Sequence, residues 1–386
     1  MLYNGGGVLL NKGMSHGNFI FLIFLLSLWL LSYTLIINRT EKGFLRYLLI
    51  WTVGRVLGTF KTKSLLLFFV FFELRVIPIT LIVFIFGYQP EKLQASFSLL
   101  LYTVTRSMPL LLFILIGELS LLTSAVLTFP VTISFMVKTP MYLVHIWLPK
   151  AHVEAPVGGS ILLAGVLLKL GSYGLLVFLP NVKLNMLLTW YFAISLIGST
   201  VCSLICLRQG DFKLLVAYSS VVHMRVVTLG YLRGREIGYR CGLIIVLRHG
   251  LCSPHLFAFG HWYYQSSHSR LILNNNCTLP IMISGLIALA SLNMGVPPSL
   301  SVWAEVLITI RLLHFIVLVF PLLIFILFLS AAYNLYMYVS CRHCKRIEND
   351  RTLNNASFYS LLQVLFLGYC SFVCLDLFHP SFFYPI

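Results

Sequence analysis

The chain has 386 residues, of which 59% are hydrophobic and only 10% charged, and its mean hydropathy is +0.93. A water-soluble domain of this length needs far more charge to cover its surface, whereas a bilayer solvates apolar surface directly. The net charge of +16 does not indicate a nucleic-acid binder, because the basic residues mostly punctuate apolar runs and do not gather on one soluble face.

The N-terminus has neither a cleavable signal peptide nor an Arg/Ser-rich transit sequence, and residues 1–17 are a short Gly-rich stretch that leads into an apolar run. The glycines at 5–7 do not follow a strand and are therefore no dinucleotide fingerprint. A chain that is this apolar and has no import signal is expected to be inserted into a membrane of the compartment in which it is synthesised. A bacterial membrane and an organelle with its own ribosomes both fit.

Apolar segments long enough to cross a bilayer recur along the whole chain, separated by short polar loops. Arg46 and Arg55 make the second of these segments the weakest prediction. The longest polar stretch is about residues 341–357, so no soluble domain is predicted. The predicted spans lie near residues 17–37, 44–60, 64–88, 94–116, 119–139, 156–179, 184–207, 211–231, 238–264, 278–310, 316–340 and 358–378.

The nine cysteines form no framework. Cys202 and Cys206 lie four apart in an apolar run, where they are expected to be small packing residues. Cys341 and Cys344 form one C-x-x-C, but no second pair follows at the spacing of a zinc site. A basic loop that contains cysteines is therefore preferred to a metal site.

Two predicted spans are interrupted by proline. The run 119–139 ends at Lys138 and Pro140 and stops again at Pro149, and the run 278–310 contains Gly-Val-Pro-Pro at 295–298. Proline frees carbonyl groups of the preceding turn, and in a bilayer such groups must face protein or water. Paired broken helices in two halves of a chain indicate an inverted repeat with an ion path, although two unrelated kinks also explain prolines alone.

Four ionisable residues at membrane depth favour the ion path: Glu73, Lys138, Lys169 and Glu305. One charge at the bilayer centre costs at least about 3 kcal/mol even on the lenient insertion scale, so each must face a partner or water. A lysine and a carboxylate that meet in such a place titrate as a unit and suit proton transfer. Histidine also relays protons near neutral pH, although a packed structural role explains any single one equally well. The histidines near these spans are His145, His152, His223 and His249.

Soluble-enzyme chemistry finds no support in the sequence. G-x-S-x-G, H-E-x-x-H and P-loop patterns are absent, and the acidic residues are too few for a hydrolase-like carboxylate pair to be recognised.

Several motifs together are specific for one family. The chain closely resembles the chain 4 branch of the antiporter-like, proton-pumping membrane subunits of mitochondrial NADH:ubiquinone oxidoreductase (respiratory complex I). The resemblance runs from about Phe68 to about Glu305, with a weaker tail. The motifs are residues 136–140 (MVKTP), 145–156 (HIWLPKAHVEAP) and 167–171 (LLKLG), supported by 87–93 (GYQPEKL), 217–224 (AYSSVVHM), 249–251 (HGL), 268–270 (HSR) and 295–299 (GVPPS).

The resemblance implies roles for the buried charges. Glu73 and Lys138 match the family's coupling pair, Lys169 its second lysine, and Glu305 its terminal glutamate. His223 and His249 match the histidines between them. It also implies an antiporter-like fold of fourteen helices, with two inverted five-helix repeats that each contain a broken helix. NADH, FMN, iron–sulfur clusters and ubiquinone are expected on other subunits, and no cofactor on this chain.

Three departures from the family pattern stand out. About 12 spans are predicted instead of fourteen, so the N-terminus is expected to be shortened. Pro254 is expected to kink the span 238–264. Arg106, Arg225 and Arg248 fall where the family has small or neutral residues. Either permanent charges beside His223 and His249 block the path, or the arginine codons are read as serine, as some mitochondrial codes do.

The sequence thus predicts an all-α polytopic membrane protein that translocates protons within complex I of the inner mitochondrial membrane. Expected partners are neighbouring antiporter-like subunits and lipids such as cardiolipin, and no nucleic acid. A subunit of a multi-subunit cation/proton antiporter and a structural subunit that does not pump are the alternatives. The predicted organisation is an N-terminal segment with the first span at 1–43, one repeat at 44–179, a second at 184–340, and a basic loop with the last span at 341–386.

Overall fold

The fold is described from a computed structural model, which describes residues 43–62, 64–116, 125–179, 186–232, 236–267, 269–272, 280–297, 299–313 and 320–343. The predicted spans at 17–37 and 358–378 lie outside the described residues, as does Cys344 of the C-x-x-C pair.

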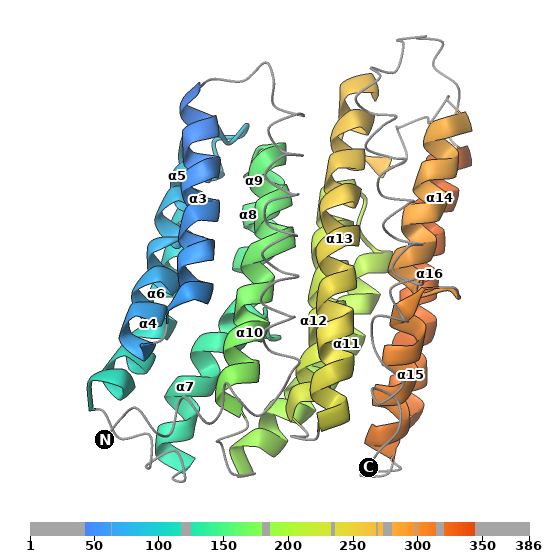
Figure 1. Ribbon diagram of the computed structural model, residues 1–386. Coiled ribbons are helices and arrows are strands. Elements are labelled where there is room, and N and C mark those ends of the chain that lie inside the picture. The colour runs from blue at the N-terminus through green and yellow to red at the C-terminus, as the bar shows by residue number, and fades with distance from the viewer. Residues whose placement is uncertain are drawn as a thin grey trace. The chain divides into compact units, whose positions relative to one another are not determined.

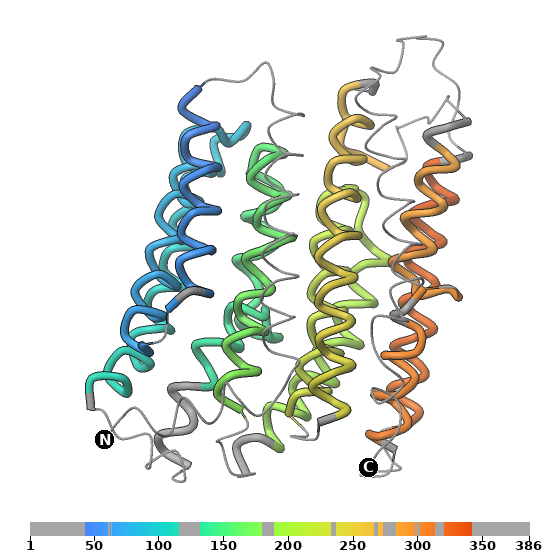
Figure 2. Tube along the Cα trace, viewed as in Figure 1, coloured from blue at the N-terminus to red at the C-terminus, as the bar shows by residue number. Residues whose placement is uncertain are grey.

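Helices make up nearly all of the described chain (Figures 1 and 2). One isolated antiparallel bridge joins Asp211 to Leu271. The helices are α3 (Gly43–Lys61), α4 (Leu65–Leu74), α5 (Val76–Phe86), α6 (Lys92–Ile116), α7 (Ala125–Lys138), α8 (Trp147–Glu154), α9 (Val157–Leu162), the π-helix η2 (Leu163–Leu167), α10 (Leu168–Phe178), α11 (Met186–Leu207), α12 (Phe212–Leu232), α13 (Glu236–Ser267), α14 (Pro280–Met294), α15 (Leu300–Leu313) and α16 (Phe320–His343).

Seven segments of the described chain are long and apolar enough to cross a membrane. Helix α3 covers residues 44–60, the span predicted with the least support. It contains two arginines and is not among these seven segments. The helices confirm the predicted all-α membrane fold, while the inverted repeats and the total number of spans stay predictions. The seven are Leu65–Phe86, Lys92–Leu115, Val157–Phe178, Thr189–Leu207, Phe212–Leu232, Ile237–Gln265 and Phe320–Cys341.

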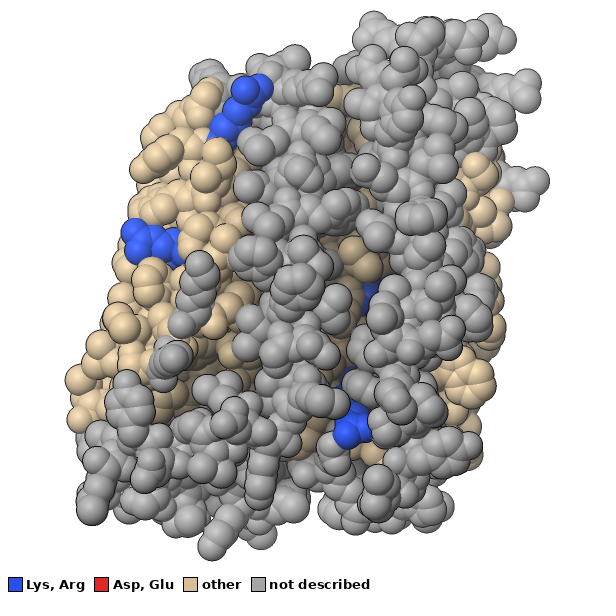
Figure 3. Space-filling view, viewed as in Figure 1, with Lys and Arg blue, Asp and Glu red and all other residues tan. Residues whose placement is uncertain are grey.

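The surface of the described part fits a lipid environment. On the face drawn in Figure 3, the described residues show a few separate basic patches among uncharged side chains, and no acidic side chain of the described residues is visible. Large apolar side chains are exposed along the spans, among them Phe97 and Leu112 of α6 and Phe328 of α16. Such a surface is costly in water and natural against acyl chains.

The chain divides into two compact units. The first comprises residues 1–195 and 228–235, and the second comprises residues 196–227 and 236–386. In the first unit α6 packs along α5 and α7, and α10 packs along α7; in the second, α13 packs along α14 and α15, and α14 along α16.

Both predicted helix breaks are present. Helix α7 ends at Lys138 and α8 begins at Trp147, and the connection contains Leu143 with a φ of 79°. Helix α14 ends at Met294 and α15 begins at Leu300, with Gly295 at a φ of 78°. Glycine adopts that left-handed conformation without strain, whereas leucine does so only at a cost. Pro254, by contrast, does not end α13, which continues through it.

Candidate functional site

Lys138 and Glu73 form an ion pair in the first unit. Lys138 is the last residue of α7, at the first break, and Glu73 lies in the last turn of α4. The Lys138 Nζ atom bonds Glu73 Oε1, and the two side chains are only 5% and 16% exposed. The Lys138 Nζ atom also lies 3.4 Å from the centre of the Phe72 ring. The structure therefore gives each of these charges a partner inside the protein, as membrane depth requires.

Arg75 lies beside this pair and was missed by the sequence analysis. It separates α4 from α5, is fully buried, and lies 4.3 Å from the centre of the Phe72 ring. Its three guanidinium nitrogens have no hydrogen-bond partner among the described residues. The signal that could have revealed it is its place two residues after Glu73, inside an apolar run.

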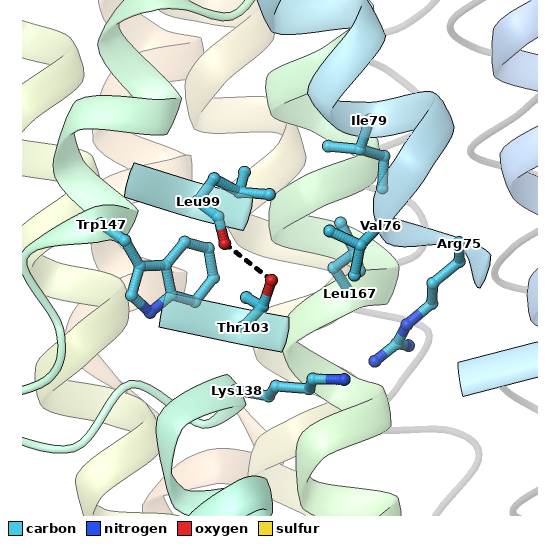
Figure 4. A pocket seen from close by; sticks show the side chains of 8 residues that line it. All are labelled: Arg75, Val76, Ile79, Leu99, Thr103, Lys138, Trp147 and Leu167. Atoms are coloured by element: carbon cyan, nitrogen blue, oxygen red, sulfur yellow. Dashed lines mark hydrogen bonds between the residues drawn. The ribbon is translucent and has the colours of Figure 1, made fainter. Parts of the chain in front are cut away.

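A small cavity is lined by both cationic residues. Its volume is about 20 Å³, and Figure 4 shows the Arg75 guanidinium and the Lys138 amino group directed toward each other at its edge. The Thr103 hydroxyl and the Trp147 ring lie on its other side, and Thr103 donates to Leu99 O at 2.6 Å. The lining of the cavity is mostly apolar, so a water molecule there would have few hydrogen-bond partners.

Lys169 is buried next to an irregular stretch of its helix. The π-helical turn η2 ends just before α10, and the Lys169 Nζ atom donates to Ala164 O within that turn at 2.5 Å. A π-turn widens the helix and loosens its regular hydrogen bonding, so a carbonyl is available for the lysine. The predicted second lysine therefore faces a backbone dipole of its own span.

Glycine brings the Lys169 helix against the end of the Lys138 helix. A Cβ atom at Gly171 would lie 2.9 Å from Thr139 Cγ2 and 3.0 Å from the Lys138 carbonyl carbon. At Gly174 it would lie 2.2 Å from the Phe135 ring. Only residues without a side chain permit this approach. The sequence thus places α10 in direct contact with the break.

A second buried cluster lies beside the second break, within the second unit. The His223 Nδ1 atom lies 3.3 Å from Arg248 Nη2 and 4.0 Å from Glu305 Oε1, and Arg248 Nη2 lies 3.4 Å from the same oxygen. The His249 ring lies with its centre 5.8 Å from that of His223. The hydroxyl of Tyr333, which the sequence analysis did not single out, lies 3.3 Å from His223 Nε2.

The broken helix supplies acceptors to this cluster. Arg248 Nη1 donates to Leu292 O and, at 3.1 Å, to Asn293 O, both in the last turn of α14. The helix ends at Met294, so the carbonyls of its last turn have no α-helical partner, although Leu292 O also accepts from Gly295 N at 3.3 Å. Of the other two unexpected arginines, Arg225 is fully buried in α12 and Arg106 is exposed near the middle of α6.

The structure thus brings the six predicted site residues into two settings. Glu73 pairs with Lys138, and Lys169 lies in a helix packed on the same break. His223, His249 and Glu305 gather around the second break. Among the described residues, no group of three His, Cys, Asp or Glu side chains is placed to hold a metal ion. Partnered, buried, titratable groups beside opened helices form the kind of site through which ions or protons cross a membrane.

Comparison with known proteins identifies the class. The family model described as "NADH:quinone oxidoreductase/Mrp antiporter, TM" matches residues 62–332, which span both breaks. The chain belongs to this family of antiporter-like membrane subunits.

Within the family, two curated relatives carry the name NADH-ubiquinone oxidoreductase chain 4. That of Ceratitis capitata is 39% identical over 84% of this chain and 78% of its own length. That of Artemia franciscana is 39% identical over 82% of this chain and 81% of its own length. The resemblance noted from the sequence motifs is confirmed.

Solved structures carry the same fold. A chain of respiratory complex I from Thermus thermophilus superposes with a TM-score of 0.83 at 23% identity, covering 94% of this chain and 82% of its own. A chain of the Mrp complex from Dietzia sp. superposes with a TM-score of 0.79 at 16% identity, covering 93% and 81%. These matches confirm the predicted antiporter-like fold.

Proposed function

We propose that this chain is a core membrane subunit of respiratory complex I that translocates protons, driven by electron transfer from NADH to ubiquinone on other subunits. The observation that carries the proposal is the buried Lys138–Glu73 ion pair at the end of a broken membrane helix. Curated relatives that carry the chain 4 name support the assignment to complex I.

The roles of the site residues follow from their chemistry and from the family resemblance. In the coupling pair, Glu73 stabilises the charged form of Lys138, and weakening that pair lets Lys138 release its proton. Lys169, His223 and His249 are the relay, and Glu305 is the gate toward the exit side. Each is buried and has a polar or charged neighbour, so a proton can be held there without an isolated charge in lipid.

The location and partners follow from the same assignment. The proposed site of action is the inner mitochondrial membrane, because the curated relatives belong to animals. Neighbouring antiporter-like subunits are the proposed protein partners. Cardiolipin is a proposed lipid partner, since basic residues at the ends of membrane helices attract its anionic head group.

Lys138→Ala tests the proposal in the assembled complex. Proton pumping is expected to be lost, while the hydrophilic arm still oxidises NADH with an artificial acceptor, because the substitution removes the titrating group but no redox site. Lys92→Ala is the matched control, since Lys92 lies at the start of α6 and its Nζ atom donates to a nearby exposed carbonyl, Ile85 O, at 3.5 Å. Pumping by Lys138→Ala at the normal ratio of protons to electrons would remove Lys138 from the mechanism.

A cation/proton antiporter subunit is the second candidate, and the fold shared with the Mrp complex is the observation that favours it. The two candidates differ in what drives transport. Complex I transport needs NADH oxidation and stops when quinone reduction is blocked, whereas exchange by an antiporter follows an imposed cation gradient without NADH. Vesicles that contain the purified assembly separate the two.

A further inference from the structure

Helix α16 contributes a buried hydroxyl to the second cluster. Tyr333 is fully buried, and its Oη atom lies 3.3 Å from His223 Nε2, on α12. A buried tyrosine hydroxyl usually needs a hydrogen-bond partner, and here the partner is a residue of the predicted relay. None of the six site residues predicted from the sequence lies on α16.

The neighbours of the imidazole ring decide the direction of this hydrogen bond. Arg248 Nη2, 3.3 Å from Nδ1, can only donate, so Nδ1 accepts. The proton of the neutral ring then lies on Nε2 and is donated to the Tyr333 hydroxyl oxygen. Tyr333 therefore keeps Nδ1 as the unprotonated nitrogen, and Nδ1 is also the atom that lies 4.0 Å from Glu305.

The next residue of α16 fixes the position of Tyr333. Asn334 is 1% exposed, accepts from Asn293 Nδ2 at 2.9 Å and donates to Ser330 O at 2.8 Å. Asn293 lies in the last turn of α14, at the break. Two adjacent residues of α16 thus bond the broken helix and the relay histidine, so the hydroxyl is held at a set distance from the ring.

Other titratable groups surround the hydroxyl from four helices. They are Cys206 of α11, His223 of α12, Arg248 and Cys252 of α13, and Glu305 of α15. A proton that reaches His223 changes the charge seen by all of them. The orientation of this one ring therefore affects the whole cluster.

We propose that Tyr333 is a positioning residue for proton transfer: by accepting a hydrogen bond from His223 Nε2 it holds the ring with Nδ1 directed at Glu305. The proposal rests on the proposed function, because it assigns Tyr333 a part in the same relay. Tyr333 itself neither gains nor loses a proton in this role.

Tyr333→Phe in the assembled complex tests the role, because phenylalanine keeps the ring and removes only the hydroxyl. The expected result is a several-fold lower ratio of protons pumped to electrons, with normal assembly and normal NADH oxidation by an artificial acceptor. The alkaline limb of the pH profile of pumping is expected to move to lower pH by about 0.5 to 1 unit, because the charged ring donates a stronger hydrogen bond to the hydroxyl than the neutral ring does.

Tyr338→Phe is the matched control, since Tyr338 lies on another face of the same helix. Lys138→Ala in the same assay separates the two proposals: if it pumps normally, the proposed function fails, whereas if it is inactive and Tyr333→Phe pumps normally, only the role of Tyr333 fails. A Tyr333→Phe complex with reduced pumping but an unshifted pH profile would show a purely structural contribution, and that result also overturns the proposal.

Discussion

At the scale of single residues, the first cluster carries more positive than negative charge. Lys138 and Arg75 both contact the Phe72 ring, and Glu73 is the one carboxylate that reaches Lys138 among the described residues. A buried ion pair is stable only when each charge is compensated, so loss of one partner leaves an isolated charge. Glu73 therefore stabilises the charged state of Lys138.

Glu73→Gln is expected to abolish or strongly reduce pumping, because the amide cannot stabilise the charged lysine. It is also expected to destabilise the unit by about 3 to 5 kcal/mol, the cost of leaving a buried charge without its partner, unless Lys138 becomes neutral. Proton pumping per electron and thermal unfolding of the complex measure the two effects. Glu91→Gln, at an exposed position, is the control. Normal pumping with glutamine at position 73 would contradict the coupling role.

Arg75 and Arg106 are difficult to explain as arginines. The Arg75 nitrogens have no acceptor among the described residues, and Arg106 is exposed near the middle of a membrane helix. Each placement costs several kcal/mol for a permanent cation. Serine would avoid the cost, because the hydroxyls of this chain bond carbonyls three or four residues earlier, as those of Thr80 and Ser107 do.

Peptide mass spectrometry of the purified protein is expected to find serine at positions 75 and 106, from codons that the mitochondrial code reads differently. Trypsin would then not cleave after either position. With serine at 75, the space that the guanidinium fills beside Lys138 would be available to water, as a proton path requires. The same digest covers Arg225 and Arg248. Arginine at 75 and 106 would contradict this explanation and establish a permanent cation beside Lys138.

The sequence revealed the buried charges but not their partners. Glu73, Lys138, Lys169 and Glu305 were recognisable because a charge inside an apolar run is costly to bury, which indicates a functional role. Arg75 and Tyr333 were missed for different reasons. Arg75 lies two residues from Glu73, and the charge of this run was assigned to Glu73 alone. Tyrosine is apolar enough to be interpreted as a packing residue in a membrane span.

At the scale of helices, the first cluster depends on the close approach of α10 to α7. Gly171 and Gly174 lie one turn apart on α10 and make contact with Thr139 and Phe135. Tight packing through small residues is the main force between membrane helices, because lipid removes the hydrophobic drive. The position of Lys138 is thus set by residues on a different helix.

Gly171→Val is expected to destabilise the first unit by about 1 to 3 kcal/mol, because the added atoms overlap Thr139 and the Lys138 backbone. Pumping should fall as well, since the end of α7 is displaced from Glu73. Gly54→Ala is the control: a Cβ atom there meets nothing within 4 Å, and alanine raises helix propensity. Thermal unfolding and proton pumping are the measurements, and a stable, fully active Gly171→Val variant would contradict the packing argument.

The membrane spans could be predicted from the sequence, whereas the irregular turns could be predicted only in part. Apolar length located the helices, and proline located both breaks, because these are local properties of the sequence. The π-turn at Leu163–Leu167 has no such signal, because Ala-Gly-Val reads as ordinary helix. Which helices pack together depends on contacts between distant residues and could not be read from local pattern.

At the scale of the whole molecule, each of the two compact units contains one broken helix and one buried charged cluster. The first has the lysine–glutamate pair, and the second has the histidines with Glu305. A proton pump needs a source of free energy. In the proposed function that energy comes from electron transfer in partner subunits, so the chain should act only within an assembly.

Native gel electrophoresis of mildly solubilised membranes tests this requirement. The chain is expected to migrate with a very large assembly that oxidises NADH in the gel, and to be lost from that band when harsher detergent separates the membrane subunits from one another. Apolar side chains such as Phe97 and Phe328 are exposed and bind detergent, so the released chain is expected to stay in solution. A dissociated subunit and an aggregate can then be distinguished by their size on the gel. Migration with an assembly that lacks NADH oxidation but exchanges cations for protons would instead assign the chain to an antiporter, since chains of both kinds of assembly have this fold.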